Sequence, residues 1–495
     1  MNRREFLAGA AALLGTGCRA LRFGVHRPRA VVIFYADDLG YGDTSAYGRA
    51  EVPTPNLERL CREGRRFTDA HSPTSVCTPS RYSLLTGDYA FRRPEITILD
   101  GDAKMVLPKV GDGQLTLPMM MRSAGYRTAA IGKWHLGLGA GAEPIDWNRH
   151  ISPGPREAGF DYSFIMAATA DRVPCVFLRD GDVVGLDPAD PIEISYDRVE
   201  RKWPDEKTGR TNPELLKAWG GTKDHQHDKT IIDGISRIGH MRGGAAACWR
   251  DQEISDVLCG EAERFLADAE ADGERVFLYF CTSDVHVPRD PHPRFRGRSS
   301  LGIRGDVAVQ MDDALGRVRE SLARHGYEDA LFIFTSDNGP FVADGYEDGA
   351  SEKWAGVNPS EPWRGGKYGP YEGGTRIPFV VAWPGEVRAG TVSSALVSQT
   401  DLGRTLAHIV GVSVPEDSMR DSVCLASELI DGVGGGRETL IEQPGWGPRG
   451  VRRGKWKLVA AAEPELYDLE ADPGETVNLA AAHPELVREL LSHLK

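Results

Sequence analysis

Residues 31–35 read Val-Val-Ile-Phe-Tyr, and Asp37 and Asp38 follow almost at once. A short, uninterrupted apolar run is typical of a strand that is buried on both faces of a parallel sheet. Two further runs of this type stand at 276–280 and 331–335. Together they predict a sheet of parallel strands with acidic residues at one strand end.

Helical patterns lie between these runs, at 56–63 and 307–324. Alternation of strands and helices predicts an α/β fold, with a large, mostly parallel sheet covered by helices on both faces. In such sheets, the polar groups at the carboxyl ends of the strands line the active crevice. We therefore expect the chemistry of this protein at that edge.

A glycine-rich break at 432–436 marks the predicted domain boundary. It divides a large domain, 30–433, from a smaller α+β domain, 434–495. The smaller domain is predicted to contain two short strands and a helix, at 438–442, 455–459 and 484–494.

The composition excludes several classes of protein. The 495 residues are 41% hydrophobic and 26% charged, which is ordinary for a globular chain. Lys and Arg total 59 against 72 Asp and Glu, for a net charge of −13. A basic nucleic-acid footprint is absent, so we expect no nucleic-acid partner, and an anionic substrate would need a local cationic pocket. Eight cysteines are too few for a disulfide scaffold.

The N-terminus, 1–29, has the pattern of a twin-arginine export signal. Arg3 and Arg4 precede a small, apolar run at 8–17 that is too short to span a membrane. This predicts passage through the Tat exporter and a periplasmic or secreted location; a cytosolic amphipathic leader is the alternative. Cys18 follows a sequence similar to a lipoprotein cleavage box, although its Leu is one position too far away. A lipid anchor at Cys18 is therefore a second alternative.

Residues 75–87 read Ser-Val-Cys-Thr-Pro-Ser-Arg-Tyr-Ser-Leu-Leu-Thr-Gly. Pro79 near the start and Gly87 at the end bracket a short helix, with Cys77 at its positive N-terminal end. That position favours anions, so we expect a lowered thiol pKa. A lone Cys in such a turn is more often a buried structural residue.

The complete run, however, resembles the signature of the sulfatase family at every position. A second run, 125–135, is similar to the family's second signature and contains Lys133 and His135. We expect these two side chains to alternate at a strand end and so to face the same side of the crevice. The resemblance extends over most of the chain, to the Glu-Leu-Tyr-Asp-Leu stretch at 465–469. It implies that a formylglycine-generating maturation enzyme oxidises Cys77 to formylglycine, which acts as its hydrate.

A metal site is expected from the chemistry of Asp37, Asp38, Asp337 and Asn338. Three carboxylates at the ends of two strands would repel one another unless a divalent cation held them. Oxygen ligands suit calcium or magnesium better than zinc. Each Asp pair alone is also a common turn sequence. The resemblance to sulfatases implies that the ion is calcium and that the modified Cys77 completes the site.

The resemblance extends to three more positions: Arg81, His286 and Lys367. His286 stands in a His-x-Pro motif, and Lys367 precedes a Glu-Gly-Gly-Thr-Arg-Ile-Pro landmark. The sequence departs from the family at Tyr368, where many members have Gly directly after the Lys. A lone His or Lys would otherwise be interpreted as solvated or satisfied in the core.

These residues imply a route for sulfate ester hydrolysis. Calcium, Lys133, Arg81 and Lys367 would neutralise the sulfate and hold it in line. One hydroxyl of the hydrated aldehyde would attack sulfur and form a covalent sulfo-enzyme. His286 with Lys367 would protonate the leaving alcohol, and His135 would deprotonate the remaining hydroxyl so that sulfate departs.

The substrate is predicted from the insert between the core motifs. Three side chains there are expected to bind sugar hydroxyls: Arg172, His225 and His227; Tyr196 lies in the same insert. An ordinary surface loop is the alternative for each. The runs at 184–188 and 234–239 are similar to bacterial members grouped with N-acetylgalactosamine-6-sulfatases. They predict a 6-O-sulfated N-acetylgalactosamine or galactose in a polysaccharide or glycosaminoglycan, with an aryl sulfate as the simpler substrate.

Two other functions compete with this interpretation. A phosphatase or phosphomutase of the same superfamily would share the sheet but would need a Ser or Thr nucleophile and ligands for two zinc ions. The run at 75–87 argues against it. A non-catalytic exported glycan-binding protein on the same scaffold is the second alternative, and the complete set of ligand and catalytic residues argues against that.

Overall fold

The computed structural model describes residues 27–217 and 226–494. The sequence predictions for Arg3, Arg4, Cys18 and His225 concern residues outside these ranges. Within them, no helix combines the length and the apolar character needed to cross a membrane.

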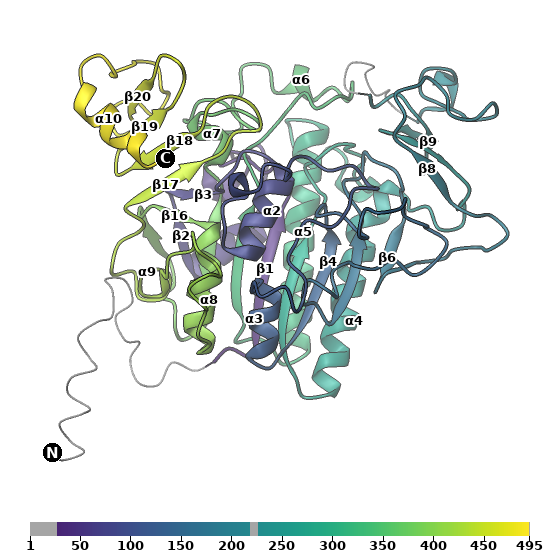
Figure 1. The fold of residues 1–495 in the computed structure, drawn as a ribbon, viewed down its shortest axis with the longest axis horizontal. Helices are drawn as coiled ribbons and strands as arrows, with labels where there is room; N and C mark the ends of the chain where they lie inside the picture. The colour runs from purple at the N-terminus through teal and green to yellow at the C-terminus, as the bar shows by residue number, and fades with distance from the viewer. Residues whose placement is uncertain (1–26, 218–225, 495) are drawn as a thin grey trace.

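A ten-stranded mixed sheet forms the centre of the described chain (Figure 1). Its strands, in spatial order, are β15 (Thr391–Ser393), β2 (Arg65–Phe67), β14 (Phe379–Ala382), β13 (Leu331–Ser336), β1 (Ala30–Ala36), β12 (Arg275–Cys281), β4 (Tyr126–Lys133), β5 (Tyr162–Met166), β6 (Phe177–Arg179) and β7 (Asp182–Val183). The five strands from β13 to β5 are parallel, whereas β14 and β6 pair antiparallel at either side. The three apolar runs of the sequence become β1, β12 and β13, as predicted.

Helices cover both faces of this sheet, which confirms the α/β prediction. On one face lie α1 (Pro55–Glu63), α4 (Ile254–Ala271) and α5 (Ile303–Arg324); on the other lie α2 (Cys77–Thr86), α3 (Leu117–Ser123), α8 (Leu402–Val410) and α9 (Ala426–Ile430). Side chains of β1 alternate between them, because Phe34 joins the first core and Tyr35 the second. The sheet is therefore buried on both faces, which explains the uninterrupted apolar runs.

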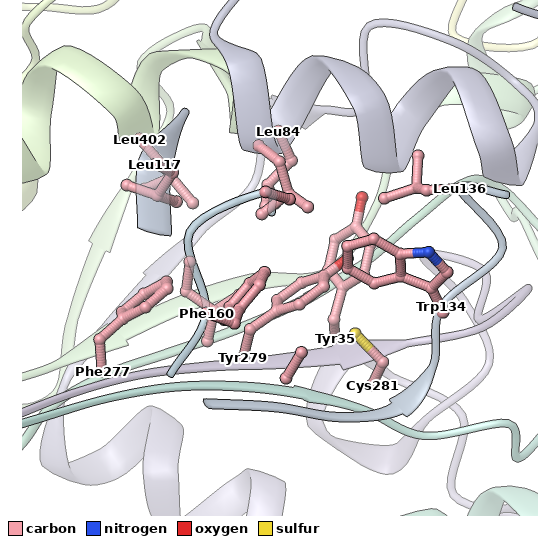
Figure 2. Close-up of a cluster of buried hydrophobic side chains, with 14 of the residues drawn as sticks. Tyr35, Leu84, Leu117, Trp134, Leu136, Phe160, Phe277, Tyr279, Cys281 and Leu402 are labelled. Atoms are coloured by element: carbon pink, nitrogen blue, oxygen red, sulfur yellow. The ribbon is translucent and has the colours of Figure 1, made fainter. Parts of the chain in front are cut away.

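The second core supports the helix that carries Cys77. Figure 2 shows Leu84 of α2 and Leu117 of α3 opposite Tyr35 and Tyr279 of the sheet. The Tyr35 hydroxyl lies 2.8 Å from the Ser80 hydroxyl of α2. This buried hydrogen bond helps fix α2 on the sheet beyond what apolar packing alone would do.

The end of the chain forms a four-stranded antiparallel sheet with one helix (yellow in Figure 1). Its elements are β17 (Thr439–Glu442), β18 (Gly450–Arg453), β19 (Trp456–Val459), β20 (Glu465–Asp468) and α10 (Pro484–Ser492). The predicted strands and helix of the smaller domain correspond to β17, β19 and α10. Leu458, Leu466 and Leu490 form its small core. The boundary near residue 433 remains a prediction.

Shorter elements complete the described chain. They are the pairs β3 (Ala70–His71) with β16 (Val397–Ser398), β8 (Glu193–Ser195) with β11 (His240–Arg242), and β9 (Ile231–Ile232) with β10 (Ile235–Ser236), and the helices α6 (Ala350–Lys353) and α7 (Glu372–Thr375).

Candidate active site

Polar side chains from four neighbouring strands meet at the carboxyl edge of the sheet. Asp37 and Asp38 follow β1, Asp337 and Asn338 follow β13, Lys133 ends β4, and His286 lies in the loop after β12. Each of these six is at most 5% exposed. The parallel strands thus bring together residues as far apart in the chain as Asp38 and Asn338, whose side chains are hydrogen-bonded at 2.7 Å.

Helix α2 presents Cys77 to this edge. The helix begins at Cys77 and ends before Gly87, whose left-handed φ of 66° caps it as the sequence predicts. The Thr78 hydroxyl donates to the His135 carbonyl at 3.0 Å, which ties the start of α2 to the end of β4. Cys77 is 2% exposed, so its side chain is held inside the fold.

The expected lowering of the Cys77 pKa is wrong. Burial raises the pKa of this thiol, and the opposing effect of Lys133 and Lys367 is smaller. The start of a helix favours the thiolate, but desolvation by the surrounding protein dominates. An unmodified Cys77 is therefore a protonated thiol at neutral pH and a poor nucleophile.

Asp37 and Asp337 each face a buried cation. Lys133 Nζ lies 2.6 Å from both carboxylate oxygens of Asp37. Arg81 donates to Asp337 at 2.8 Å and to the Lys133 carbonyl at 3.0 Å, and its guanidinium lies 5.1 Å from the Tyr35 ring centroid. Burial raises the pKa of Asp37 well above its ordinary value; Lys133 opposes this, and Asp337 adds to it. Arg81 thus orients Asp337 and the end of β4.

Asp38 is bound from two directions. Lys367 Nζ donates to one carboxylate oxygen at 2.8 Å, and the Asn338 amide donates to the other at 2.7 Å. Burial would raise the pKa of Asp38, but Lys367 and Lys133 together lower it below its ordinary value. Asp38 also has a φ of 56°, a left-handed conformation that is uncommon for a residue with a side chain. The turn after β1 is therefore set by these contacts.

The donor atoms at this edge fit a hard divalent cation. Asp37, Asp38 and His286 offer donor atoms within 4.8 Å of one another. The Asn338 Oδ1 is buried and has no hydrogen-bond partner among the described residues, which is costly unless a ligand uses it. Carboxylate and amide oxygens are the ligands that Ca²⁺ or Mg²⁺ prefers, and three close carboxylates supply the charge. Asp37, Asp38, Asp337 and Asn338 thus lie close together with His286 beside them, and their role as metal ligands, with Cys77, stays a prediction.

His286 is neutral and its free nitrogen faces the carboxylates. Its Nδ1 lies 2.8 Å from the Val287 carbonyl, which only accepts, so Nδ1 carries the proton and Nε2 the lone pair. The Nε2 atom is 3.8 Å from Asp38 and 3.9 Å from Asp344. Burial, then Lys367 and Lys133, lowers the pKa of His286 well below its ordinary value.

Asp344 is a site residue that the sequence does not predict. Its carboxylate lies 3.2 Å from Lys367 Nζ and is only 7% exposed. Together, Asp344 and Asp38 outweigh the effect of burial and raise the pKa of Lys367, which keeps the ammonium charged. The available signal was weak: an acidic residue between Val342 and Tyr346, shortly after β13.

His135 lies beyond the strand rather than on it, so the predicted alternation with Lys133 is wrong. Strand β4 ends at Lys133, and His135 has a left-handed φ of 55°. Its Nε2 lies 2.8 Å from the Leu99 carbonyl and therefore carries the proton, which leaves the lone pair on Nδ1. That Nδ1 is buried without a hydrogen-bond partner among the described residues. Burial, with Lys133 and Arg172, lowers the pKa of His135 well below its ordinary value.

Two of the predicted substrate-binding residues lie together next to this site. Arg172 donates to Asp171 at 3.1 Å and lies 3.5 Å from Asp100. His227 Nε2 lies 3.0 Å from the other Asp171 oxygen. Tyr196, by contrast, is a packing residue: its hydroxyl accepts from the Gly101 N–H at 2.8 Å and donates to a backbone carbonyl. His225 lies outside the described residues.

Comparison with known proteins agrees with this geometry. The family model described as Sulfatase matches residues 29–412. The chain is 42% identical over 478 residues to the N-acetylgalactosamine-6-O-sulfatase of Bacteroides thetaiotaomicron, covering 93% of this chain and 91% of that protein. It is 29% identical to human arylsulfatase A, covering 95% and 88%. A solved structure from work on glycosaminoglycan metabolism by B. thetaiotaomicron superposes with a TM-score of 0.89 at 42% identity, over 95% of this chain and 99% of that one.

Proposed function

Because the chain belongs to the sulfatase family and is a sulfuric ester hydrolase, we propose that it removes 6-O-sulfate groups from N-acetylgalactosamine or galactose units of a sulfated polysaccharide or glycosaminoglycan. The relative with 42% identity is an N-acetylgalactosamine-6-O-sulfatase, which supports this choice of sugar. The observation that carries the proposal is the placement of Cys77, at the start of α2, within electrostatic reach of Lys133, Lys367, Asp337 and Asp37.

We propose that Cys77 is converted to formylglycine by a maturation enzyme. The raised pKa of the thiol makes an unmodified Cys77 a weak nucleophile in this pocket. A hydrated aldehyde at this position would supply a hydroxyl nucleophile and a second hydroxyl for product release. Peptide mass spectrometry of an active sample tests this directly: a Cys77 peptide found only with the mass of the free thiol would contradict it.

The cation held by Asp37, Asp38, Asp337 and Asn338, which we propose to be calcium, would supply positive charge to the sulfate oxygens and to the oxygen at residue 77. The protein adds two ammonium groups of its own. Lys133 and Lys367 are both buried and lie against Asp37 and Asp38 respectively. Positive charge fixed in a water-poor pocket stabilises an anionic transition state more strongly than it would in water. Arg81 acts indirectly, because its guanidinium binds and orients Asp337.

Proton transfer is assigned to the two histidines and Lys367. His135 has a buried lone pair on Nδ1 with no hydrogen-bond partner among the described residues, and is the base that takes a proton from the oxygen at residue 77. Lys367 holds a proton, and His286 Nε2 lies beside the carboxylates that Lys367 binds. We assign this pair to protonation of the leaving alcohol.

Recognition of the sugar is assigned to Arg172 and His227, with His225 as a further candidate. Arg172 is within electrostatic reach of both Cys77 and His135, so a sugar bound at the nucleophile would contact it. Asp171 joins Arg172 to His227 and holds both side chains in place. Arg172→Ala should raise KM for the sulfated sugar and affect a small aryl sulfate much less.

The deciding experiment compares sulfate release from N-acetylgalactosamine 6-sulfate and from the 4-sulfate. The chain is expressed together with a maturation enzyme, and Cys77→Ala is the matched control. We expect release from the 6-sulfate only, and none from the control. Equal release from both sugars would contradict the assigned position, and release from neither would contradict the assigned sugar.

We further propose that residues 1–29 direct export by the Tat pathway to the periplasm or the medium. Replacing Arg3 and Arg4 by Lys preserves the charge and removes only the arginine pair. Cell fractionation should then show the enzyme retained in the cytoplasm. If the double variant still leaves the cytoplasm, the signal assignment fails. Labelling with a radioactive fatty acid tests whether Cys18 carries a lipid instead.

A further inference from the structure

Trp446 is an exposed aromatic residue in the loop between β17 and β18. Its side chain is 64% exposed, more than any other large apolar side chain in the described part of the chain. Its ring stacks on Tyr368, with the ring centroids 4.2 Å apart and the planes inclined by 13°. An exposed Trp held in a parallel stack offers a flat apolar face with a fixed orientation.

The loop that carries Trp446 is bound to the segment that leads into Cys77. The Gln443 N–H donates to Pro73 at 2.9 Å, and the Ser75 N–H donates back to Gln443 at 3.0 Å. The Gly445 N–H lies 3.0 Å from the Tyr368 carbonyl. A Cβ at Gly445 would lie 2.8 Å from a Val76 methyl group, so the loop and the nucleophile segment are in direct contact. Trp446 is therefore fixed relative to the reaction centre.

Tyr368 connects this stack to the catalytic cations. It follows Lys367 directly, and Lys367 Nζ lies 5.2 Å from the Tyr368 ring centroid. Burial raises the pKa of the Tyr368 hydroxyl; Lys367 opposes this, and Asp344 and Asp38 add to it. The backbone of Tyr368 has a φ of 73°, a conformation that Gly adopts at no cost and Tyr adopts with strain. The departure from the family noted at this position thus brings an aromatic ring to the site against a backbone preference.

We propose that Tyr368 and Trp446 form an aromatic platform that binds the sugar ring next to the sulfated sugar in the substrate chain. This inference rests on the proposed function, because a polysaccharide sulfatase has a neighbouring sugar to hold. Lys367 joins the platform to the catalytic residues, and the apolar face of a pyranose matches a flat, rigid aromatic surface. The enzyme should accordingly prefer an oligosaccharide to the isolated sulfated monosaccharide.

The test compares two substrates with the same ester: N-acetylgalactosamine 6-sulfate and a tetrasaccharide that carries this unit. Trp446→Ala should raise KM for the tetrasaccharide about tenfold, the size expected for the loss of one stacked ring, and leave kcat within about twofold. Both constants for the monosaccharide should stay within about twofold. Trp446→Phe keeps an aromatic face and should restore most of the affinity. Val392→Ala, another exposed apolar position at 58%, is the matched control.

Two kinetic outcomes overturn the platform: Trp446→Ala changes KM equally for both substrates, or it changes KM for neither. A third is a KM that is unaltered while the variant sediments as a monomer and the natural chain as a dimer. The last would assign Trp446 to contact with a second copy of the chain. Titration calorimetry of the Cys77→Ala chain with the unsulfated tetrasaccharide separates the two proposals. If the tetrasaccharide binds and Trp446→Ala abolishes the binding, the platform is supported even if no sulfate is released. If neither the natural chain nor the Trp446→Ala variant releases sulfate, only the proposed ester is contradicted.

Discussion

His135 and His286 hold their protons in the same way. Each gives one ring N–H to a backbone carbonyl, and each is buried with a pKa well below its ordinary value. A neutral imidazole with a fixed tautomer presents one lone pair in a defined direction. The His286 Nε2 lies near Asp38 and Asp344, whereas the His135 Nδ1 has no partner among the described residues, so the two histidines can serve different proton transfers.

Replacement of His135 by Ala should lower kcat by about 10²–10³, the usual contribution of a general base. The loss should fall on sulfate release, so a rapid-mixing experiment with an aryl sulfate should show a first burst of phenol followed by little turnover. His286→Ala should instead suppress the burst. His150→Ala, an exposed His paired with Asp182, is the control and should leave both phases unchanged. If His135→Ala abolishes the burst, the two assignments are reversed.

Removal of the metal tests the ligand set. Asp337→Asn keeps the shape and takes one charge from the site, so we expect calcium affinity to fall about 10- to 100-fold in titration calorimetry after chelation. Activity should be recovered at high calcium concentration. Asp256→Asn, a substitution at a partly exposed residue paired with Arg294, is the control. Full activity after exhaustive chelation, with no ion found by elemental analysis, would contradict the metal site.

Between β4 and β12, the contact at Gly132 sets how closely the strands that carry Lys133 and Cys281 can approach. Gly132 has a φ of 101°, and a Cβ there would lie 1.8 Å from the Cys281 carbonyl oxygen. Backbone atoms of a central strand cannot move aside as a flexible side chain can. The glycine therefore fixes both the strand spacing and the position of the adjacent Lys133.

Gly132→Ala should lower the free energy of unfolding by about 2–5 kcal/mol, because it combines a backbone clash with a disfavoured φ. Denaturant unfolding measures this. Gly260→Ala is the matched control: Gly260 lies within α4 with open space around it. An Ala there should raise the stability by about 0.5–1 kcal/mol. Equal effects of the two substitutions would show that the strand contact is relaxed.

The elements differ in how much of them the sequence predicts. Strands β1, β12 and β13 are buried on both faces, so their apolar runs are continuous and easily found. The strands β2 and β15, at one side of the sheet, have three residues each and contain Arg65 or Thr391, so no periodicity marks them. Pro79 and Gly87 predict helix α2. They do not predict the raised pKa of Cys77, because its burial depends on residues far along the chain. Asp344 was missed for the same reason: its role arises only when Lys367 folds beside it.

At the scale of the whole molecule, a buried ionic cluster joins the small C-terminal sheet to α7 and to the segment at 69–71. Arg452 of β18 pairs with Glu372 of α7, and Lys457 of β19 pairs with Glu442 of β17. Asp69, His71 and Glu372 offer atoms close enough for a metal, but Arg376 and Arg452 already bind these carboxylates. The cluster is therefore an ionic seam between the C-terminal sheet and α7 with the segment at 69–71.

Glu475 makes this seam sensitive to pH. Its Oε2 accepts from the Glu372 N–H at 2.9 Å, while its Oε1 is buried without a hydrogen-bond partner among the described residues. Burial raises the pKa of Glu475 to about 8; Lys457 opposes this, and Glu372 adds to it. A carboxyl whose folded pKa is raised binds a proton more tightly in the folded state. Its contribution is therefore complete below its unfolded pKa and is lost as pH rises toward 8.

Glu475→Gln keeps the neutral shape at every pH. The difference in unfolding free energy between the variant and the natural chain should grow in favour of the variant between about pH 5 and 9, by about 1–3 kcal/mol. Urea unfolding at several pH values measures it. Glu470→Gln, at an exposed position close by in the chain, should show no such trend. A difference that is independent of pH would mean that Glu475 is charged throughout.

The loop at 443–446 is synthesised long after the segment around Cys77 that it contacts. Cys77 leaves the ribosome about 370 residues before Trp446, which at about 5–20 residues per second is an interval of about 20–70 s. Until then, the segment at 73–76 lacks the backbone partner that Gln443 provides and the Gly445 N–H that binds the Ser75 hydroxyl. The maturation enzyme that we propose must reach the Cys77 thiol, and translation sets the time during which this segment lacks those partners. The rate of translation between codons 78 and 446 should therefore affect the fraction of molecules that become active. Slower synthesis should raise this fraction without any change in the amino-acid sequence.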